Sequence, residues 1–303
     1  MMIEARDKVN KEAGARRMFA HAIFTPAWDG WLEHLEGSLA RKPESIKGYT
    51  VGDNTNKDQA KHPWRMDDEK VTYKAYELCV KHGIKNVCVH KGLFPQATAE
   101  RWPHLLAYAK VDDVGKAAKD WPQLNFIYHG GYRHAAGGRA EDGWNEFLQT
   151  GRVSWVSDLA DIPEKYGVTN VYADVGQLFA QSVVAAPLLG AALMGIMGKG
   201  LGYDRVVWGT DAVWTGSPQW QIEALRRLEI PEDMQKKYGF APLGPADGPV
   251  KTAILSGNSS RLYGLQKQAE LGRRDRFAAL KADYVANGPA RSNLRYGYVA
   301  KPA

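Results

Sequence analysis

The sequence has very few cysteines and no apolar stretch long enough to cross a membrane. Two thiols, Cys79 and Cys88, cannot form the disulfide framework of a small secreted domain, and they suit a reducing compartment. The longest apolar run, residues 183–198, is shorter than the roughly 18 residues of a membrane helix and is interrupted by Pro187. The charged first residues lack the apolar core of a signal peptide. We therefore expect a cytoplasmic protein with no membrane partner, in which residues 183–198 form a buried amphipathic helix.

Several motifs that define enzyme classes are also absent. There is no G-x-S-x-G turn for a serine nucleophile, although an HGG sequence occurs, and the glycine motifs of nucleotide-binding loops are missing. Neither H-E-x-x-H nor C-x-x-C is present, which argues against zinc proteases and zinc fingers of the usual kinds. The chemistry of this chain must therefore come from residues that are far apart in the sequence.

Positive charge is concentrated at the C-terminal end of the chain. Residues 265–303 contain eight Lys or Arg and three Asp or Glu, so this segment carries +5 of the formal net charge of +6. A nucleic-acid-binding protein would need a basic face on a recognition fold, and we find only a basic segment with helical spacing. We divide the chain into an α/β domain, residues 1–264, and a basic, partly helical tail, residues 265–303. No nucleic-acid partner is expected.

The sequence does contain a repeated strand-then-helix pattern. Six short runs rich in β-branched or aromatic residues are each followed by a segment with helical character. They are RMFAHAIFT at residues 17–25, SIKGYTV at 45–51, NVCVH at 86–90, LNFIYH at 124–129, VYADVG at 171–176 and RVVWGTD at 205–211. Such alternation predicts a parallel sheet covered by helices, either doubly wound or closed into a barrel.

Three of these strands end in a side chain that can bind a metal or transfer a proton. These residues are His90, His129 and Asp211, and Asp174 lies close to the end of a fourth strand. The C-terminal edge of a parallel sheet is where α/β proteins usually assemble their sites. One histidine at a strand end is more often structural, but three such ends predict a functional site. For Asp174 we consider two roles, orientation of neighbouring site residues or a hydrogen-bonded strand end.

Four ordered motifs resemble the amidohydrolase superfamily. The motifs are VCVHKG at residues 87–92, FIYHGG at 126–131, VVWGTDAVW at 206–214 and ILSGNSSRLYGL at 254–265. They are most similar to the metal-dependent hydrolase and decarboxylase branch that contains aminocarboxymuconate semialdehyde decarboxylase, and the resemblance extends over residues 17–265. It implies a TIM-like (β/α)8 barrel that acts on a small carbonyl or carboxylate substrate by hydrolysis or non-oxidative decarboxylation. The implied cofactor is a divalent metal, zinc or alternatively manganese.

The resemblance also implies roles for individual residues. His90 corresponds to the metal-binding histidine that ends the fifth strand of the family, and His129 to the catalytic histidine that ends the sixth. Asp211 corresponds to the aspartate that ends the eighth strand, binds the metal and handles the proton of the attacking water. Gly257 and Asn258 correspond to the segment leading into the last helix, where we expect helix capping.

These roles are consistent with the chemistry of the side chains. A bound divalent metal lowers the pKa of water to roughly 7, which supplies hydroxide at neutral pH. His129 would then lie next to the water or the developing oxyanion, and the adjacent glycines allow substrate to approach the backbone. Arg133, in the loop that follows, is a candidate for binding a substrate carboxylate through its forked guanidinium, with a solvated loop arginine as the alternative.

The sequence departs from the family pattern at its N-terminal end. The family has an H-x-H pair at the end of its first strand, and this sequence contains no H-x-H. Counting back from Asp211 as the end of strand eight makes residues 17–25 the third strand, so we expect the first two βα units to be absent. His21 lies within this strand and is not expected to replace a missing ligand.

Two interpretations follow from this departure. The first is a metal-dependent amidohydrolase-type hydrolase or lyase. The second is a truncated or degenerate homologue without catalysis that acts as a binding or oligomerisation subunit. Open sheet edges would favour a homo-oligomer in either case.

Overall fold

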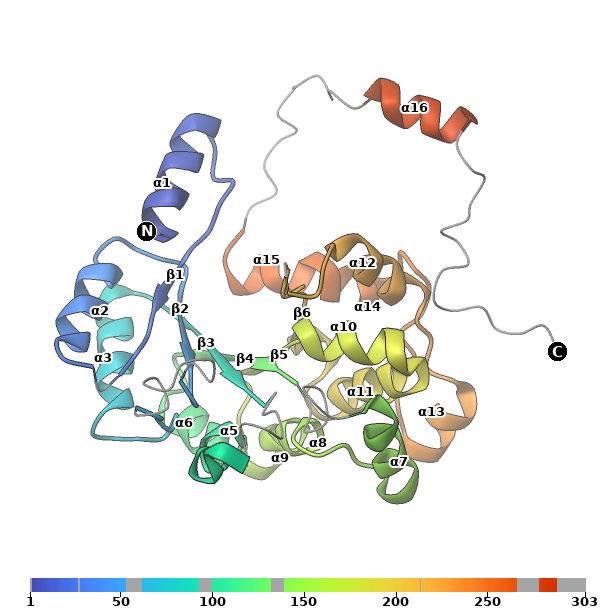
Figure 1. Cartoon of the computed structure of the whole chain (residues 1–303), viewed down its shortest axis with the longest axis horizontal. Coiled ribbons are helices and arrows are strands. Elements are labelled where there is room, and N and C mark those ends of the chain that lie inside the picture. Colours follow the sequence, from blue (N-terminus) through green and yellow to red (C-terminus); the bar gives the residue numbers. More distant parts are fainter. Residues whose placement is uncertain are drawn as a thin grey trace.

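The computed structural model describes residues 2–26, 28–52, 62–92, 100–131, 139–212, 214–265 and 278–287. Within these residues, six parallel strands form one sheet in the order of the sequence, and helices lie between successive strands (Figure 1). The strands are β1 (His21–Ile23), β2 (Ser45–Tyr49), β3 (Asn86–Lys91), β4 (Asn125–Gly130), β5 (Val171–Asp174) and β6 (Val206–Val207). The prediction of six parallel strands alternating with helices is confirmed.

The helices vary in length from one turn to nearly four. Those before β4 are α1 (Met2–Ala13), α2 (Trp31–Leu39), α3 (Thr72–His82), the 3₁₀ turn η2 (Pro103–Leu105), α5 (Leu106–Ala109) and α6 (Val114–Asp120). Those between β4 and β6 are α7 (Ala140–Thr150), α8 (Val156–Ala160), α9 (Ile162–Tyr166), α10 (Gly176–Ala185), α11 (Pro187–Gly200) and the 3₁₀ turn η3 (Tyr203–Arg205). After β6 come α12 (Pro218–Arg227), α13 (Glu232–Tyr238), α14 (Pro249–Thr252), the π-helical segment η4 (Ala253–Gly257), α15 (Asn258–Leu262) and α16 (Ala278–Asn287). None of the described helices is long and apolar enough to span a membrane.

The sheet is open in the part of the chain that the structure describes. Strands β1 and β6 form its two edges and do not pair with each other. Six parallel strands in sequence order agree with the predicted barrel-type topology, in which each helix returns the chain to the same end of the sheet. The predicted absence of two further βα units stays a prediction.

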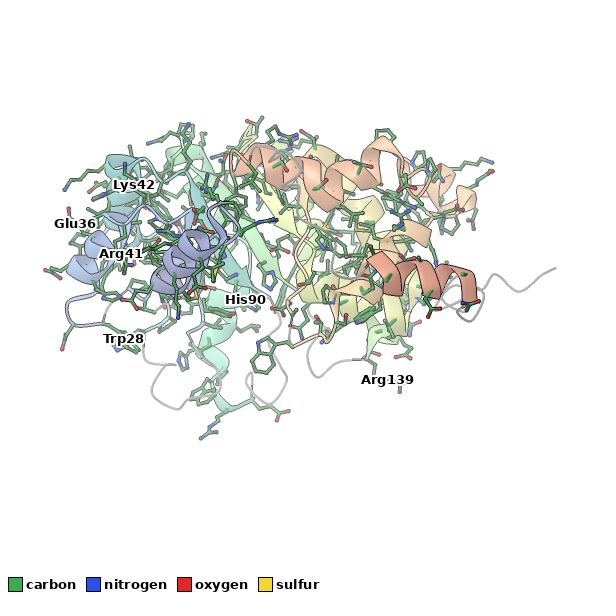
Figure 2. All side chains as sticks on the ribbon, turned by 90° about the horizontal axis from the view of Figure 1, so that it is seen from above. Trp28, Glu36, Arg41, Lys42, His90 and Arg139 are labelled. Atoms are coloured by element: carbon green, nitrogen blue, oxygen red, sulfur yellow. The ribbon has the colours of Figure 1, made fainter. Side chains whose placement is uncertain are left out.

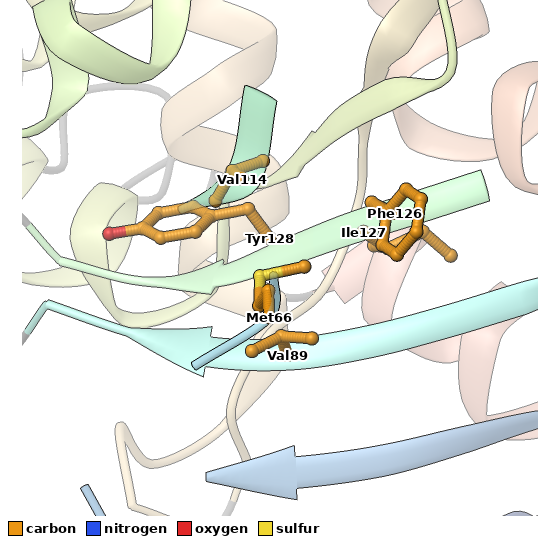
Figure 3. Close-up of a pocket in the computed structure, with 6 residues that line it drawn as sticks. All are labelled: Met66, Val89, Val114, Phe126, Ile127 and Tyr128. Carbon is orange, nitrogen blue, oxygen red and sulfur yellow. The ribbon is translucent and has the colours of Figure 1, made fainter. Parts of the chain in front are cut away.

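The main core lies between the sheet and the helices that cover its outer side. Alternate strand residues such as Ile46, Val87, Phe126 and Val171 are almost fully buried there. Figure 3 shows a small apolar gap that is lined by Met66, Val89, Val114, Phe126, Ile127 and Tyr128. The gap has no room for a water molecule, so it is core packing and not a binding site.

The apolar run at residues 183–198 does not form the single amphipathic helix that we predicted. The run is divided between α10 and α11, because Ala186 leaves the helical conformation and Pro187 begins the next helix. Nine consecutive residues of α11, 189–197, are buried, so every face of this part of the helix is covered. Helix α11 is therefore a core helix, since an amphipathic helix would leave one face exposed.

The predicted capping role of Asn258 is also wrong. Gly257 and Asn258 both have right-handed helical backbone conformations, and the Asn258 side chain makes no capping bond to α15. Instead, the buried Nδ2 of Asn258 donates to the carbonyl oxygens of Tyr203 and Val206, both at 2.7 Å. This side chain attaches the closing helical segment to β6, whose carbonyl would otherwise be buried without a partner.

Candidate active site

The inner face of the sheet, opposite the main core, carries the predicted site residues. Strand pairing places Tyr49 beside His90, His90 beside His129, and His129 beside Asp174. These side chains form a row across β2, β3, β4 and β5 near the C-terminal ends of the strands. His90 lies near the middle of the molecule, away from Glu36, Arg41 and Lys42 (Figure 2). The structure thus brings together side chains that are more than a hundred residues apart in the sequence.

His129 lies between two carboxylates. Its Nδ1 is 3.2 Å from Oδ2 of Asp174, and its Nε2 is 3.5 Å from Oδ1 of Asp211. An imidazole can donate from both nitrogens at once only when it is protonated. The geometry therefore favours the imidazolium form of His129. Asp174, at the end of β5, contacts His129 and also accepts a hydrogen bond from Gly176, so both roles considered for it from the sequence are compatible with its contacts.

The electrostatics of the pair support this protonation state. Burial acts to lower the pKa of His129, but the charge and hydrogen bonds of Asp174 and Asp211 outweigh burial, and the pKa is raised above the ordinary 6.5. Burial acts to raise the pKa of Asp174, but His129 and then Lys47 outweigh it, and this pKa is lowered below 3.8. Each shift favours the charged form of its group, which supports an ion pair between His129 and Asp174.

Two glycines provide the space that this pair occupies. A Cβ atom on Gly209 would lie 2.2 Å from Oδ1 of Asp174, and one on Gly176 would lie 2.3 Å from Cε1 of His129. The backbone N–H of Gly176 also donates to Oδ1 of Asp174 at 3.0 Å. Both positions require glycine for close approach to a functional side chain.

Asp211 follows β6 in a left-handed backbone conformation, with φ of 52°. A non-glycine residue in this region is uncommon and is held there by the surrounding structure. Here the conformation places the carboxylate at Nε2 of His129. The sequence predicted Asp211 as the last residue of a strand at 205–211, but β6 ends at Val207 and Asp211 reaches the site through the turn that follows.

The pKa of His90 is shifted in the opposite direction from that of His129. Its pKa is lowered well below 6.5, first by burial and then by the positive charges of His129 and Lys47. Its ring stacks on Tyr49 with a centroid separation of 4.6 Å, and its buried Nδ1 has no hydrogen-bond partner in the described part of the chain. His90 is thus a neutral imidazole beside a charged one, with a ring separation of 5.4 Å.

The neutral state of His90 suits a metal ligand, but the site as described does not form a complete metal centre. No group of three His, Cys, Asp or Glu side chains comes close enough to hold one ion within the described ranges. Catalytic zinc usually has three protein ligands, and His129 directs both of its nitrogens to carboxylates. The assignment of His90 and Asp211 as metal ligands stays a prediction, and no step proposed below passes through a metal.

The predictions made for Arg133 and for His21 have different outcomes. Arg133 lies outside the described residues, so its proposed carboxylate contact stays a prediction. His21 is the first residue of β1 and lies at the opposite end of the strand from the site, where its Nδ1 contacts the Ser45 hydroxyl. Burial, assisted by Lys47, lowers the pKa of His21 to about 4, so it is neutral.

Sequence reasoning missed Lys47 and Tyr49 on the same inner face. Both belong to SIKGYTV, which was read only as a strand. A lysine in the middle of a strand between an isoleucine and a glycine was the available signal, since lysine is rarely placed on a buried strand face without a function. Tyr49 shares its face by the two-residue period of the strand.

The fold and the site together define a parallel α/β protein with a histidine–carboxylate pair at the C-terminal edge of its sheet. The amidohydrolase family model Amidohydro_2 matches residues 54–265, which is more than half of the chain. The protein therefore belongs to the amidohydrolase family. Its members are commonly metal-dependent.

Comparison with solved structures gives weaker similarities. 2,6-Dihydroxybenzoate decarboxylase from Rhizobium is 15% identical, with a TM-score of 0.47, and the match covers 87% of this chain and 77% of that one. A uronate isomerase from Bacillus halodurans is 12% identical, with a TM-score of 0.40 and coverage of 87% and 56%. These values are too low to transfer a substrate or an activity. A search of curated protein sequences found no match.

Proposed function

We propose that this protein is an amidohydrolase-family enzyme that uses His129 to transfer a proton to a small carboxylate substrate during non-oxidative decarboxylation. The observation that supports this proposal is the imidazole of His129 between Asp174 and Asp211, at 3.2 and 3.5 Å. A buried imidazolium is a proton donor ready for use at neutral pH, whereas activation of water first requires a proton acceptor.

The chemical step needs only one proton and no electron acceptor. The substrate must be unsaturated at the carbon that bears the carboxylate, because a π-electron pair of the substrate forms the bond from this carbon to the proton of His129. The bond between this carbon and the carboxyl carbon then breaks, its electron pair restores the π bond, and CO₂ leaves. Water returns the proton to His129. Asp174 orients the imidazole and stabilises its charged form, as an aspartate does for the histidine of a serine protease.

Hydrolysis is the second candidate reaction, and the position of Asp211 favours it. Asp211 lies at the strand edge, 21% exposed, and is the carboxylate available to accept a proton from water. This reaction fits the predicted role of Asp211 and the zinc or manganese commonly used in the family. Metal analysis of the purified protein tests that part of the proposal.

The proposal is tested by activity of the purified full-length chain. Release of CO₂ from a panel of aromatic and aliphatic carboxylic acids would be measured, together with hydrolysis of the corresponding amides and esters. His129→Gln should reduce the rate roughly 10²- to 10⁴-fold, which is the usual contribution of general acid–base catalysis. His34→Gln is the matched control, because His34 is exposed and lies on α2, outside the strands that carry the site. Equal rates for the wild type and His129→Gln would overturn the proposal.

A non-catalytic binding or oligomerisation subunit is the alternative from another class. It is favoured by the lack of a three-residue metal group within the described ranges. A wild-type protein that holds no stoichiometric metal, turns over no compound of either panel, and still self-associates would support this alternative.

A further inference from the structure

Lys47 is the one basic side chain other than histidine that the described strands place on the inner face. Its neighbours across the sheet are Ile23 on β1 and Cys88 on β3. The row of Tyr49, His90, His129 and Asp174 lies two residues further along each strand. Lys47 is therefore in the neighbouring row, toward the N-terminal ends of the strands. Its charge acts on His90, His129 and Asp174, as their pKa shifts show.

The ammonium of Lys47 lacks the partners that the other enclosed lysines have. Lys91 donates to two backbone carbonyls, at 2.9 and 2.8 Å, and pairs with Asp113 at 3.0 Å. Lys251 donates to the carbonyl of Arg226 at 3.0 Å. The ammonium of Lys47 makes no hydrogen bond or ion pair with any described residue, and it lies over the ring of Tyr49, with Nζ 5.5 Å from the ring centroid.

An unpaired ammonium in this position is unfavourable unless a ligand completes it. Burial lowers the pKa of Lys47, and the interactions with Cys88, Asp174 and Asp211 only partly oppose this effect. Tyr49 is 48% exposed as a residue, and its ring stacks on His90, so an aromatic surface lies beside the cation. The ammonium of Lys47 therefore has an aromatic surface beside it but no negatively charged group paired with it among the described residues.

We propose that Lys47 is the binding group for the carboxylate of the ligand, and that the ligand packs its apolar part against Tyr49. A carboxylate has the charge and the acceptor atoms that the ammonium lacks, and it would hold the ligand on the face where His129 transfers its proton. This inference rests on the proposed function for the identification of the ligand as a substrate. The binding site itself can be tested without turnover.

The test is calorimetric titration of the full-length protein with benzoate, and with benzamide as the neutral analogue. Wild type should bind benzoate more tightly than benzamide. Lys47→Met should weaken benzoate binding at least about tenfold, because a charged hydrogen bond is lost, and should leave benzamide binding unchanged. Lys47→Arg should retain most of the affinity. Lys85→Met is the matched control, because Lys85 is exposed just before β3, and it should bind as the wild type does.

Folding of the variants is checked first by thermal unfolding. Removal of an unpaired cation should not lower the midpoint, and Lys47→Gln provides a second variant if methionine disturbs the strand. Equal benzoate affinity in wild type and both variants would overturn the inference, as would a wild type that does not distinguish benzoate from benzamide or binds neither. Lys47-dependent binding without turnover would reject the proposed reaction and keep the site. Turnover that is independent of Lys47 would reject the site and keep the reaction.

Discussion

His129 shows how a histidine can remain protonated in an enclosed position. Only 10% of its side chain is exposed, and burial alone would make it neutral, as it does for His90 one strand away. The difference comes from the carboxylates of Asp174 and Asp211, which contact both nitrogens of His129. Two histidines that are paired across neighbouring strands therefore have pKa values shifted in opposite directions, downward for His90 and upward for His129.

The raised pKa of His129 predicts a pH dependence of stability. A group with a folded pKa above its unfolded value stabilises the fold fully below the unfolded pKa, about 6.5 for histidine, and loses this contribution as pH rises through the folded pKa. The difference in unfolding free energy between wild type and His129→Gln should therefore fall as pH rises above about 6.5 and through the raised pKa of His129. Urea titrations across this range measure it. Asp174→Asn should flatten the dependence, and a difference that grows with pH would contradict the assignment.

At the scale of elements, the site depends on the turns that follow the strands. Strand β5 is followed at once by α10, and β6 is followed by the turn that contains Asp211. Gly176, the first residue of α10, leaves room for His129, and Gly209, which follows β6, leaves room for Asp174. The strands place the side chains in a row, and the two glycines allow His129 and Asp174 to approach each other.

Gly209→Ala should disturb both stability and activity. The new methyl group would overlap the carboxylate of Asp174, at 2.2 Å from Oδ1, and would displace it from His129. Overpacking of this kind costs about 1–3 kcal/mol in unfolding free energy, measured by urea denaturation. Gly37→Ala is the control, since a Cβ at Gly37 in α2 meets no atom within 4 Å, and it should be stabilising by about 0.5–1 kcal/mol. A Gly209→Ala protein with unchanged stability and activity would show that the pair tolerates displacement.

At the scale of the whole molecule, the β1 side of the sheet carries the features of an interface. β1 is an edge strand of three residues, and its inward-facing Ile23 is 48% exposed. Helix α1 docks nearby, where Arg6 donates to the carbonyls of Arg41 and Lys42 at 3.0 and 2.8 Å. The helix therefore supports this side of the molecule but leaves an apolar residue at the edge uncovered.

We predict that the protein is a homo-oligomer and that the β1 edge contributes to the contact. Phe19→Glu should shift the assembly toward monomer in light scattering coupled to size-exclusion chromatography, because Phe19 is 37% exposed just before β1 and a charge would be placed in an apolar contact. Leu148→Glu is the control, since Leu148 is also exposed, at 51%, but lies on α7. A monomeric wild type would contradict the prediction.

The fold was predictable to the extent that it depends on local patterns. The six strands and the position of His90, His129 and Asp211 near strand ends followed from apolar runs and their two-residue period. The division of residues 183–198 into two helices at Pro187 was missed because apolar residues continue on both sides of the proline. The sequence therefore shows no change of periodicity where one helix ends and the next begins. The role of Asn258 was missed because its partners, Tyr203 and Val206, come from another element.

The sequence by itself determined which side chains stand at the ends of the strands, since alternation along a strand is a property of the local backbone. Only the tertiary structure decided that Asp174 and Asp211 hold His129 from two sides, and that Lys47 faces the same space without a partner. The physical reason is that lateral register between parallel strands depends on the packing of whole βα units. A histidine near a strand end was therefore visible in the sequence, and its charge was not.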